Sequence, residues 1–185
     1  KKYPTDEKSD IQTEYPYALT KNLGEKLLAH WSKVYKTSTI SLRLFNVYGV
    51  RSRTTGAYGA MFGVFMAQKL HNKPYTIVGN GKQTRSFCYV NDQVDGLISL
   101  IESDFEKPIN IGNPSEITIL ELAQIVCNIT KTDLKIVDMP LPVDDPVKRC
   151  PDISLAKKIL DWEPKTDLID GLNNTLLWFK EKINE

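Results

Sequence analysis

Cysteine and histidine are scarce in this chain, and no segment is apolar over the length of a membrane span. The three cysteines, Cys88, Cys127 and Cys150, are far apart and form no Cys-x-x-Cys pair, and the histidines are His30 and His71. This pattern argues against a metal centre and a disulfide framework, and favours buried free thiols in a reducing cytoplasm. No apolar run approaches the roughly 18 residues that a membrane helix needs.

The chain also lacks a net charge of either sign. Its 24 basic and 23 acidic residues are interspersed and leave a formal charge of +1. There is therefore no long-range reason for it to bind nucleic acid or an anionic membrane, and any phosphate binding must be local. With 41% hydrophobic residues over 185 positions, the chain can bury the core of one domain, or of one and a partial second.

No strand, glycine-rich turn and helix open the chain, although this arrangement is what receives a dinucleotide pyrophosphate. The first residues, 1–8, are polar and contain a proline. The glycine spacing in 56–63 imitates the dinucleotide fingerprint, but the polar stretch 51–55 precedes it instead of a strand. We therefore interpret these glycines as a loop and a closely packed helix entry.

Tyr17 and Lys21 form the most informative pair. Positions i and i+4 lie on one face of a helix, so the ammonium of Lys21 can approach the phenol of Tyr17. A neighbouring cation stabilises the phenolate and brings a tyrosine, which ordinarily titrates near pH 10, towards use as a base at neutral pH. The spacing alone also occurs in many helices without any catalytic role.

Hydrophobic periodicity predicts an α/β chain. The helix that starts with Tyr17 has an apolar stripe of Leu23, Leu27, Trp31 and Val34. In the helix expected over 91–103, the apolar face comprises Val94, Leu97, Ile98 and Ile101. The other expected helices are 58–71, 118–129, 154–160 and 168–182; the expected strands are 39–45, 75–78 and 85–90 around a Gly-Asn-Gly turn, 108–111 and 132–139; and 140–146 is a loop.

The order of the motifs resembles the extended short-chain dehydrogenase/reductase family, specifically its nucleotide-sugar epimerases, dehydratases and decarboxylases. The Tyr-x-x-x-Lys helix is followed by Ser-Leu-Arg-Leu-Phe-Asn-Val-Tyr-Gly and then by four later landmarks of that family. These landmarks are 79–92, 109–113, 149–152 and 158–164.

The resemblance implies the C-terminal part of a Rossmann-like parallel sheet joined to a smaller α/β substrate-binding lobe. Residues 1–50 would be the remnant of the dinucleotide-binding domain, and 51–185 mainly the sugar-nucleotide lobe, with segments returning to the sheet. The N-terminal cofactor-binding half and its assisting serine or threonine would lie upstream, so we expect the isolated chain to be inactive. The intact enzyme is expected to be a cytoplasmic homodimer that uses NAD and a UDP-sugar.

The same resemblance suggests site residues. Tyr17 would be the catalytic base, and Lys21 would lower its pKa and hold the nicotinamide ribose. The residues expected to bind the sugar nucleotide are Asn46, Met61, Phe62, Arg85, Arg149 and Asp152. Physical chemistry agrees for the arginines, whose guanidinium groups pair with phosphate, and for Asp152, whose carboxylate accepts from ribose hydroxyls.

Several reactions share the first oxidation to a keto-sugar. The segment 15–25 and the loop 53–60 look more like epimerases, and we favour a UDP-hexose 4-epimerase. The segments 112–116 and 144–152 look like UDP-glucuronate decarboxylase, and a 4,6-dehydratase is a further alternative. An alternative of another class is a non-catalytic module that binds a sugar nucleotide.

Overall fold

The computed structural model describes residues 3–53, 61–71, 73–78, 80–131, 133–134, 136–139 and 148–183. The predicted loop 140–146 and most of the glycine stretch 56–63 lie outside these residues. The helices are α1 (Pro16–Tyr35), α2 (Met61–Leu70), α3 (Val90–Ile101), α4 (Ile119–Thr130), α5 (Ser154–Leu160) and α6 (Leu168–Ile183). The strands are β1 (Leu42–Leu44), β2 (Val47–Tyr48), β3 (Tyr75–Val78), β4 (Thr84–Ser86), β5 (Cys88–Tyr89), β6 (Ile109–Ile111), β7 (Glu116–Thr118), β8 (Ile136–Met139) and β9 (Lys148–Arg149).

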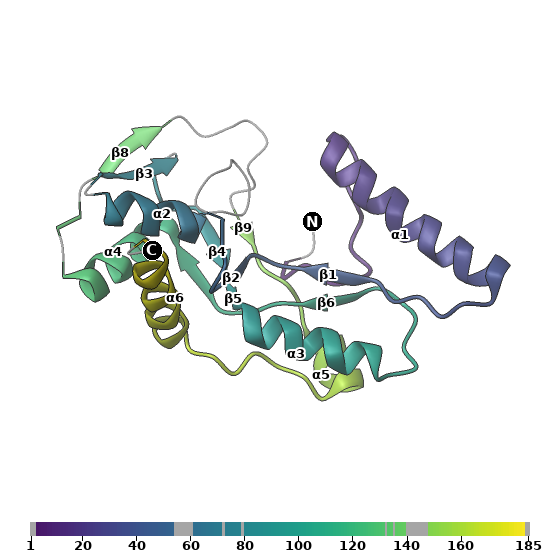
Figure 1. Ribbon diagram of the computed structural model, residues 1–185. Helices are drawn as coiled ribbons and strands as arrows, with labels where there is room; N and C mark the ends of the chain where they lie inside the picture. The colour runs from purple at the N-terminus through teal and green to yellow at the C-terminus, as the bar shows by residue number, and fades with distance from the viewer. Residues whose placement is uncertain are drawn as a thin grey trace.

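A parallel pair of strands, β1 and β6, lies between helices (Figure 1). Helix α1 lies on one side of the pair, and α3 and α5 lie on the other. All three residues of β6 are buried, and the packing behind them is tight because Gly96 of α3 leaves room for Trp162. A Cβ atom on Gly96 would lie 2.8 Å from Ile111 and 3.0 Å from Trp162. The buried hydrophobic cluster to which these residues belong comprises Cys88, Leu100, Ile109, Ile111, Ile153, Ala156 and Trp162.

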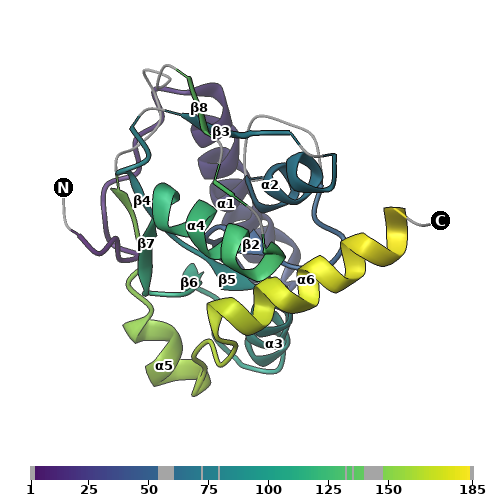
Figure 2. The same cartoon turned by 90° about the vertical axis from the view of Figure 1, so that its left-hand side faces the viewer.

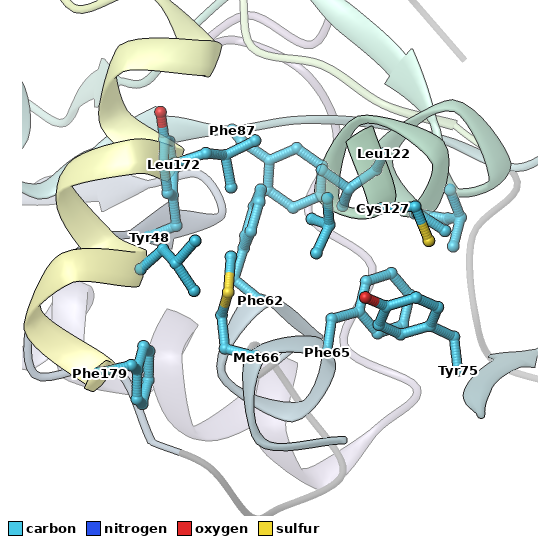
Figure 3. Close-up of a cluster of buried hydrophobic side chains, with 14 of the residues drawn as sticks. Tyr48, Phe62, Phe65, Met66, Tyr75, Phe87, Leu122, Cys127, Leu172 and Phe179 are labelled. Atoms are coloured by element: carbon cyan, nitrogen blue, oxygen red, sulfur yellow. The ribbon is translucent and has the colours of Figure 1, made fainter. Parts of the chain in front are cut away.

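The second core is aromatic and lies among α2, α4 and α6 (Figure 3). The ring of Phe62 stacks on Tyr48 with centroids 4.5 Å apart and meets Phe87 edge-on at 4.6 Å. Helices α4 and α6 pack together across this core, as Figure 2 shows from the side. Burial raises the pKa of the Tyr48 phenol, whose hydroxyl donates to the Leu168 carbonyl oxygen at 3.4 Å. The predicted α/β class and the predicted parallel strands are confirmed, because β1 pairs with β6, β2 with β5 and β3 with β8, all in parallel.

Strands β4, β7 and β9 form a three-stranded sheet that the hydrophobic pattern did not reveal. β4 pairs antiparallel with β7 and parallel with β9. The prediction missed β7 and β9 because strands of two or three residues are too short to show a period. The expected strand 85–90 was also wrong as a single element, since it is interrupted at Phe87 and Val90 already begins α3. β3 and β4 do not pair with each other; β3 pairs with β8.

The apolar faces of two helices are exposed. No residue of α1 is buried, and Leu23, Leu27 and Trp31 are each at least half exposed. For α3 the expected apolar face is also solvent-accessible, with Ile101 at 61% exposure, because the helix packs through Gly96 and Leu100 instead. None of the described helices is long and apolar enough to cross a membrane.

Candidate functional site

Tyr17 and Lys21 are in contact at the start of α1. Tyr15 precedes the helix in an extended conformation and Pro16 supplies its first residue, which is a favourable beginning because proline lacks the N–H that would be unpaired there. The Lys21 Nζ atom lies 5.5 Å from the centroid of the Tyr17 ring. Tyr17 is 74% exposed, so both groups are open to a ligand. The predicted contact is present, and the pair offers a phenol and an ammonium group to one approaching molecule.

Arg85 and Arg149 are brought together by strand pairing, although they are 64 positions apart in the sequence. They are register partners in the parallel pair of β4 and β9. Arg85 is only 5% exposed, and its Nη1 donates to the Thr84 carbonyl oxygen at 2.7 Å. Arg149 lies at the exposed edge of the same sheet. Two guanidinium groups on neighbouring strands are a suitable arrangement for an anion with several oxygens.

Asp152 follows Arg149 and connects that sheet to the N-terminal segment. The main chain of Thr5 forms a bridge beside Pro151, with Thr5 N donating to Cys150 O at 3.0 Å and Asp152 N donating to Thr5 O at 2.8 Å. The Asp152 carboxylate accepts from Ser154 N at 2.9 Å at the beginning of α5. One oxygen of the Asp152 carboxylate therefore accepts from the first residue of α5, while the main chain of Asp152 holds the segment that leads to Tyr17.

Two of the three remaining predicted residues, Asn46 and Phe62, make contacts that stabilise the fold. Asn46 lies between β1 and β2 with a positive φ of 35°, and its Nδ2 donates to the Ser86 carbonyl oxygen at 2.9 Å. Phe62 is 3% exposed within the aromatic core. Met61 begins α2, but its side chain lies outside the described part of the chain. Asn46 thus ties the end of β1 to β4, next to Arg85.

Glu116 was not predicted as part of any site, but it collects several polar contacts. Thr84 Oγ1 donates to its carboxylate. Partial burial acts to raise the pKa of Glu116, but hydrogen bonds from Thr84 and Tyr3 and the nearby Lys148 outweigh it and lower the pKa. Partial desolvation of the Tyr3 phenol and its hydrogen bond with the same carboxylate raise the pKa of Tyr3. Segment 112–116 was noted for its resemblance to UDP-glucuronate decarboxylase, but no hydrophobic period marks Glu116 itself as a site residue.

A cavity of about 460 Å³ lies beside α4 and the start of α6. Glu116 and Glu121 both line it, and hydrogen bonds from Thr118 hold the pKa of Glu121 below its usual value. Two ionised carboxylates repel a diphosphate, so this cavity does not suit the predicted ligand. Its lining comprises Phe87, Asn113, Ser115, Glu116, Ile117, Glu121, Gln124, Ile125 and Leu168.

The three cysteines are free and buried, as predicted. Burial, assisted by the nearby Asp92, raises the pKa of the Cys88 thiol to about 12. The Asp92 carboxylate itself accepts from the main chain and the hydroxyl of Thr166, at 2.9 and 3.1 Å. The Asp92 main-chain oxygen accepts from Trp162 Nε1 at 3.0 Å. Two landmarks of the predicted family, Asp92 and Trp162, therefore hold the fold together.

Comparison with known proteins identifies relatives of this chain. A sequence profile described as the NAD dependent epimerase/dehydratase family matches residues 1–112. UDP-glucuronic acid decarboxylase 1 of Arabidopsis thaliana is 45% identical over 141 residues, which are 76% of this chain and 32% of that protein. UDP-glucuronic acid decarboxylase 1 of Danio rerio is 37% identical over 163 residues, 88% of this chain and 38% of that protein. The chain thus spans less than half the length of these relatives.

Solved structures match the fold over almost the whole chain. UDP-glucose 4-epimerase of Thermotoga maritima with UDP-glucose superimposes with a TM-score of 0.92 at 30% identity, over 99% of this chain and 59% of that one. UDP-glucuronic acid 4-epimerase of Bacillus cereus with UDP-glucuronic acid and NAD gives 0.83 at 30% identity, over 95% and 58%. The sequence relatives and the structural relatives named here carry out different reactions on UDP-sugars.

Proposed function

This chain belongs to the NAD dependent epimerase/dehydratase family, and from that membership we propose that the full-length protein oxidises and then remodels a UDP-sugar. The proposed substrate is UDP-glucuronate, and the proposed reaction removes its carboxylate as carbon dioxide to leave a UDP-pentose. The observation that carries the choice is the 45% identity to a UDP-glucuronic acid decarboxylase, which exceeds the 30% identity to the two epimerases compared above.

Tyr17 is the proposed base. Lys21, close to its ring, favours the phenolate, which removes a proton from the sugar 4-hydroxyl as that carbon is oxidised to a ketone. The exposed phenol and ammonium also suit the hydroxyl groups of a nicotinamide ribose, so the donor set fits NAD. When bound, NAD supplies the hydride acceptor.

The carboxylate of glucuronate allows the oxidised sugar to lose carbon dioxide in the next step. A ketone at position 4 and a carboxylate on position 5 form a β-keto acid, whose carbon–carbon bond to the carboxylate breaks and leaves its electron pair as an enolate. The enolate then takes up a proton at position 5, and the ketone is finally reduced by return of the hydride removed in the first step, with a proton from Tyr17. The residues of this chain therefore need to hold the sugar, exchange the proton of the 4-hydroxyl and leave position 5 open to a proton donor.

The proposed binding groups come from the second part of the chain. Arg85 and Arg149, adjacent through β4 and β9, bind the diphosphate, and Asp152 binds a ribose hydroxyl through its carboxylate. Asn46, Met61 and Phe62 are proposed to lie at the sugar and uracil. Because Phe62 is buried, it would support the residues that touch the ligand. In this proposal residues 1–50 belong to the cofactor domain and 51–185 mainly to the substrate lobe, with β6 returning to pair with β1.

The epimerase interpretation is the second candidate, favoured by the 0.92 TM-score to the Thermotoga maritima enzyme. It uses the same first step, after which the ketone turns over and is reduced on its other face.

We also propose a cytoplasmic location, in keeping with three free buried thiols. A homodimer stays a prediction, for which exposed Leu23, Leu27 and Trp31 provide an apolar surface.

Product analysis separates these candidates. The full-length protein is incubated with NAD and either UDP-glucuronate or UDP-glucose, and both carbon dioxide and sugar nucleotides are measured. Carbon dioxide with a UDP-pentose supports the decarboxylase. A UDP-glucose epimer without carbon dioxide supports the epimerase, and UDP binding without any conversion supports the non-catalytic module.

A further inference from the structure

Helix α1 carries the proposed base, and few contacts within the described residues attach it to the rest of this chain. None of its 20 residues is buried, and in Figure 1 it stands apart from the other helices. Among the described residues, one ion pair joins it to another element: Arg43 of β1 to Glu25. A second, weak contact runs from Thr39 Oγ1 to the Leu28 carbonyl oxygen at 3.5 Å. Within the described residues, Arg43 therefore provides the charged contact that orients α1.

The Arg43 guanidinium uses all three of its nitrogens. Its Nε and Nη2 donate to the two carboxylate oxygens of Glu25 at 3.0 and 2.7 Å, so the pair is bidentate. Its Nη1 donates to the Glu7 carbonyl oxygen at 2.9 Å. A planar fork that holds both oxygens restrains the direction of the carboxylate as well as its distance. Arg43 thereby restrains rotation of α1 about its own axis.

The contact of Arg43 with Glu7 continues through further hydrogen bonds to the segment that contains Asp152. Glu7 accepts from Asn110 N at 2.9 Å, and Asn110 is the β6 register partner of Arg43. The buried Asn110 amide donates to Thr5 O at 3.0 Å and to Asp152 O at 3.1 Å. A continuous set of hydrogen bonds thus joins α1 to the segment that contains Asp152.

Glu25 lies on the same side of α1 as the catalytic pair. At about 100° per residue, Lys21 is about 40° and Tyr17 about 80° around the helix from Glu25. A helix with its side chains has a radius of about 5–6 Å, so a rotation of about 10° moves the tip of a side chain by about 1 Å. A displacement of that size can lower a rate by up to about 100-fold.

We propose that Arg43 and Glu25 are positioning residues, which hold the Tyr17–Lys21 face of α1 towards the sugar nucleotide bound by Arg85, Arg149 and Asp152. This inference rests on the proposed function. The pair is about one-quarter exposed, at 23% and 22%, and its bidentate geometry makes it stronger than an ordinary surface pair. Its loss should lower kcat and loosen α1, while UDP affinity, which depends on Arg85, Arg149 and Asp152 in this proposal, should be retained.

The test compares Glu25→Gln, Arg43→Met and the double variant with the wild-type full-length protein. The rate is measured with UDP-glucuronate and UDP-glucose, UDP affinity by calorimetry, and amide hydrogen exchange in α1 by mass spectrometry. We expect kcat to fall about 10- to 100-fold in each single variant, while KM and UDP affinity stay within about threefold. The double variant should be no slower than the slower single variant, since all three lose the Arg43–Glu25 interaction, and Arg43→Met also loses its hydrogen bond to Glu7 O. Amides of α1 should exchange faster in all three variants.

A matched control is Glu163→Gln, which breaks the more exposed Lys157–Glu163 ion pair and should leave kcat unchanged. Wild-type turnover with kcat retained in both single variants would overturn the positioning role and leave the proposed function intact. A weakened UDP affinity with unchanged kcat, or additive effects in the double variant, would also overturn it. Absence of turnover in the wild type would refute the proposed function, and the positioning role with it; if the Arg43→Met protein does not fold, Glu25→Gln still provides the test.

Discussion

Replacing Tyr17 by phenylalanine separates chemistry from folding unusually well. The change removes one hydroxyl group from a side chain that is 74% exposed, and it keeps the ring that Lys21 contacts at 5.5 Å. Surface changes of this kind alter the free energy of unfolding by no more than about 0.5 kcal/mol. The folded structure and the affinity for UDP should therefore be retained.

The rate should fall greatly. A positioned general base typically contributes about 100- to 10,000-fold, which is roughly 3 to 5 kcal/mol of the activation barrier. The assay is conversion of UDP-glucuronate by the full-length protein with NAD, followed by chromatography, and in parallel UDP binding by calorimetry and thermal unfolding. Turnover within about threefold of the wild type would refute the assignment of Tyr17 as the base.

Tyr35→Phe is the matched control. Tyr35 ends the same helix, is 60% exposed and contacts Trp31 with ring centroids 4.5 Å apart. It loses the same hydroxyl group, four to five turns from Tyr17 on a helix of 20 residues. Its turnover, UDP affinity and melting temperature should match the wild type. An equal loss of rate in both variants would mean that the effect of Tyr17→Phe comes from α1 in general.

Three further predictions follow from the burial of particular groups. Arg85→Ala should weaken UDP binding by about 10- to 150-fold, or about 1.5–3 kcal/mol, because a charge-assisted contact to phosphate is lost; unchanged affinity by calorimetry in a folded variant would remove Arg85 from the site. Gly96→Ala should lower the free energy of unfolding by about 1–3 kcal/mol in urea titration, because the added Cβ overpacks against Trp162 and Ile111; an unchanged midpoint would contradict this packing. The Cys88 thiol, with a pKa raised from 9.0 to about 12, should resist alkylation by iodoacetamide at pH 9 in the folded protein and react readily in guanidinium. Since the unfolded thiol ionises first, its titration should lower stability as the pH rises from about 9 towards 12, and equally fast alkylation with and without guanidinium would refute the shift.

Local patterns in the sequence were sufficient for most elements of the fold. The expected helix 154–160 coincides with α5, and the expected strand 75–78 with β3. Thr118 was predicted to begin a helix, and it caps α4 through reciprocal hydrogen bonds with Glu121. Helix periodicity and capping act within a few residues along the chain, which is why they can be inferred without a tertiary structure.

The contact of Tyr17 with Lys21 was also predictable, because the spacing of four residues creates it within one helix. Periodicity could not reveal which face of α3 is buried, since a glycine determines it. Gly96 lets Trp162 approach from 66 positions later in the chain, and the more apolar face with Ile101 is left exposed. The buried face therefore depends on shape rather than on hydrophobicity alone.

The assembly of the candidate site was decided by the tertiary structure. Arg85 and Arg149 were each predicted from the sequence to bind phosphate, but only the pairing of β4 with the two-residue β9 makes them neighbours. Arg43 was part of a predicted strand, and nothing in its local sequence indicated that it would hold Glu25 of α1 and the main chain of Glu7. The sequence by itself determined the helices and the chemistry available on each. Strand pairing and hydrogen bonds between distant segments decided which of those groups meet, because both depend on contacts that have no fixed spacing along the chain.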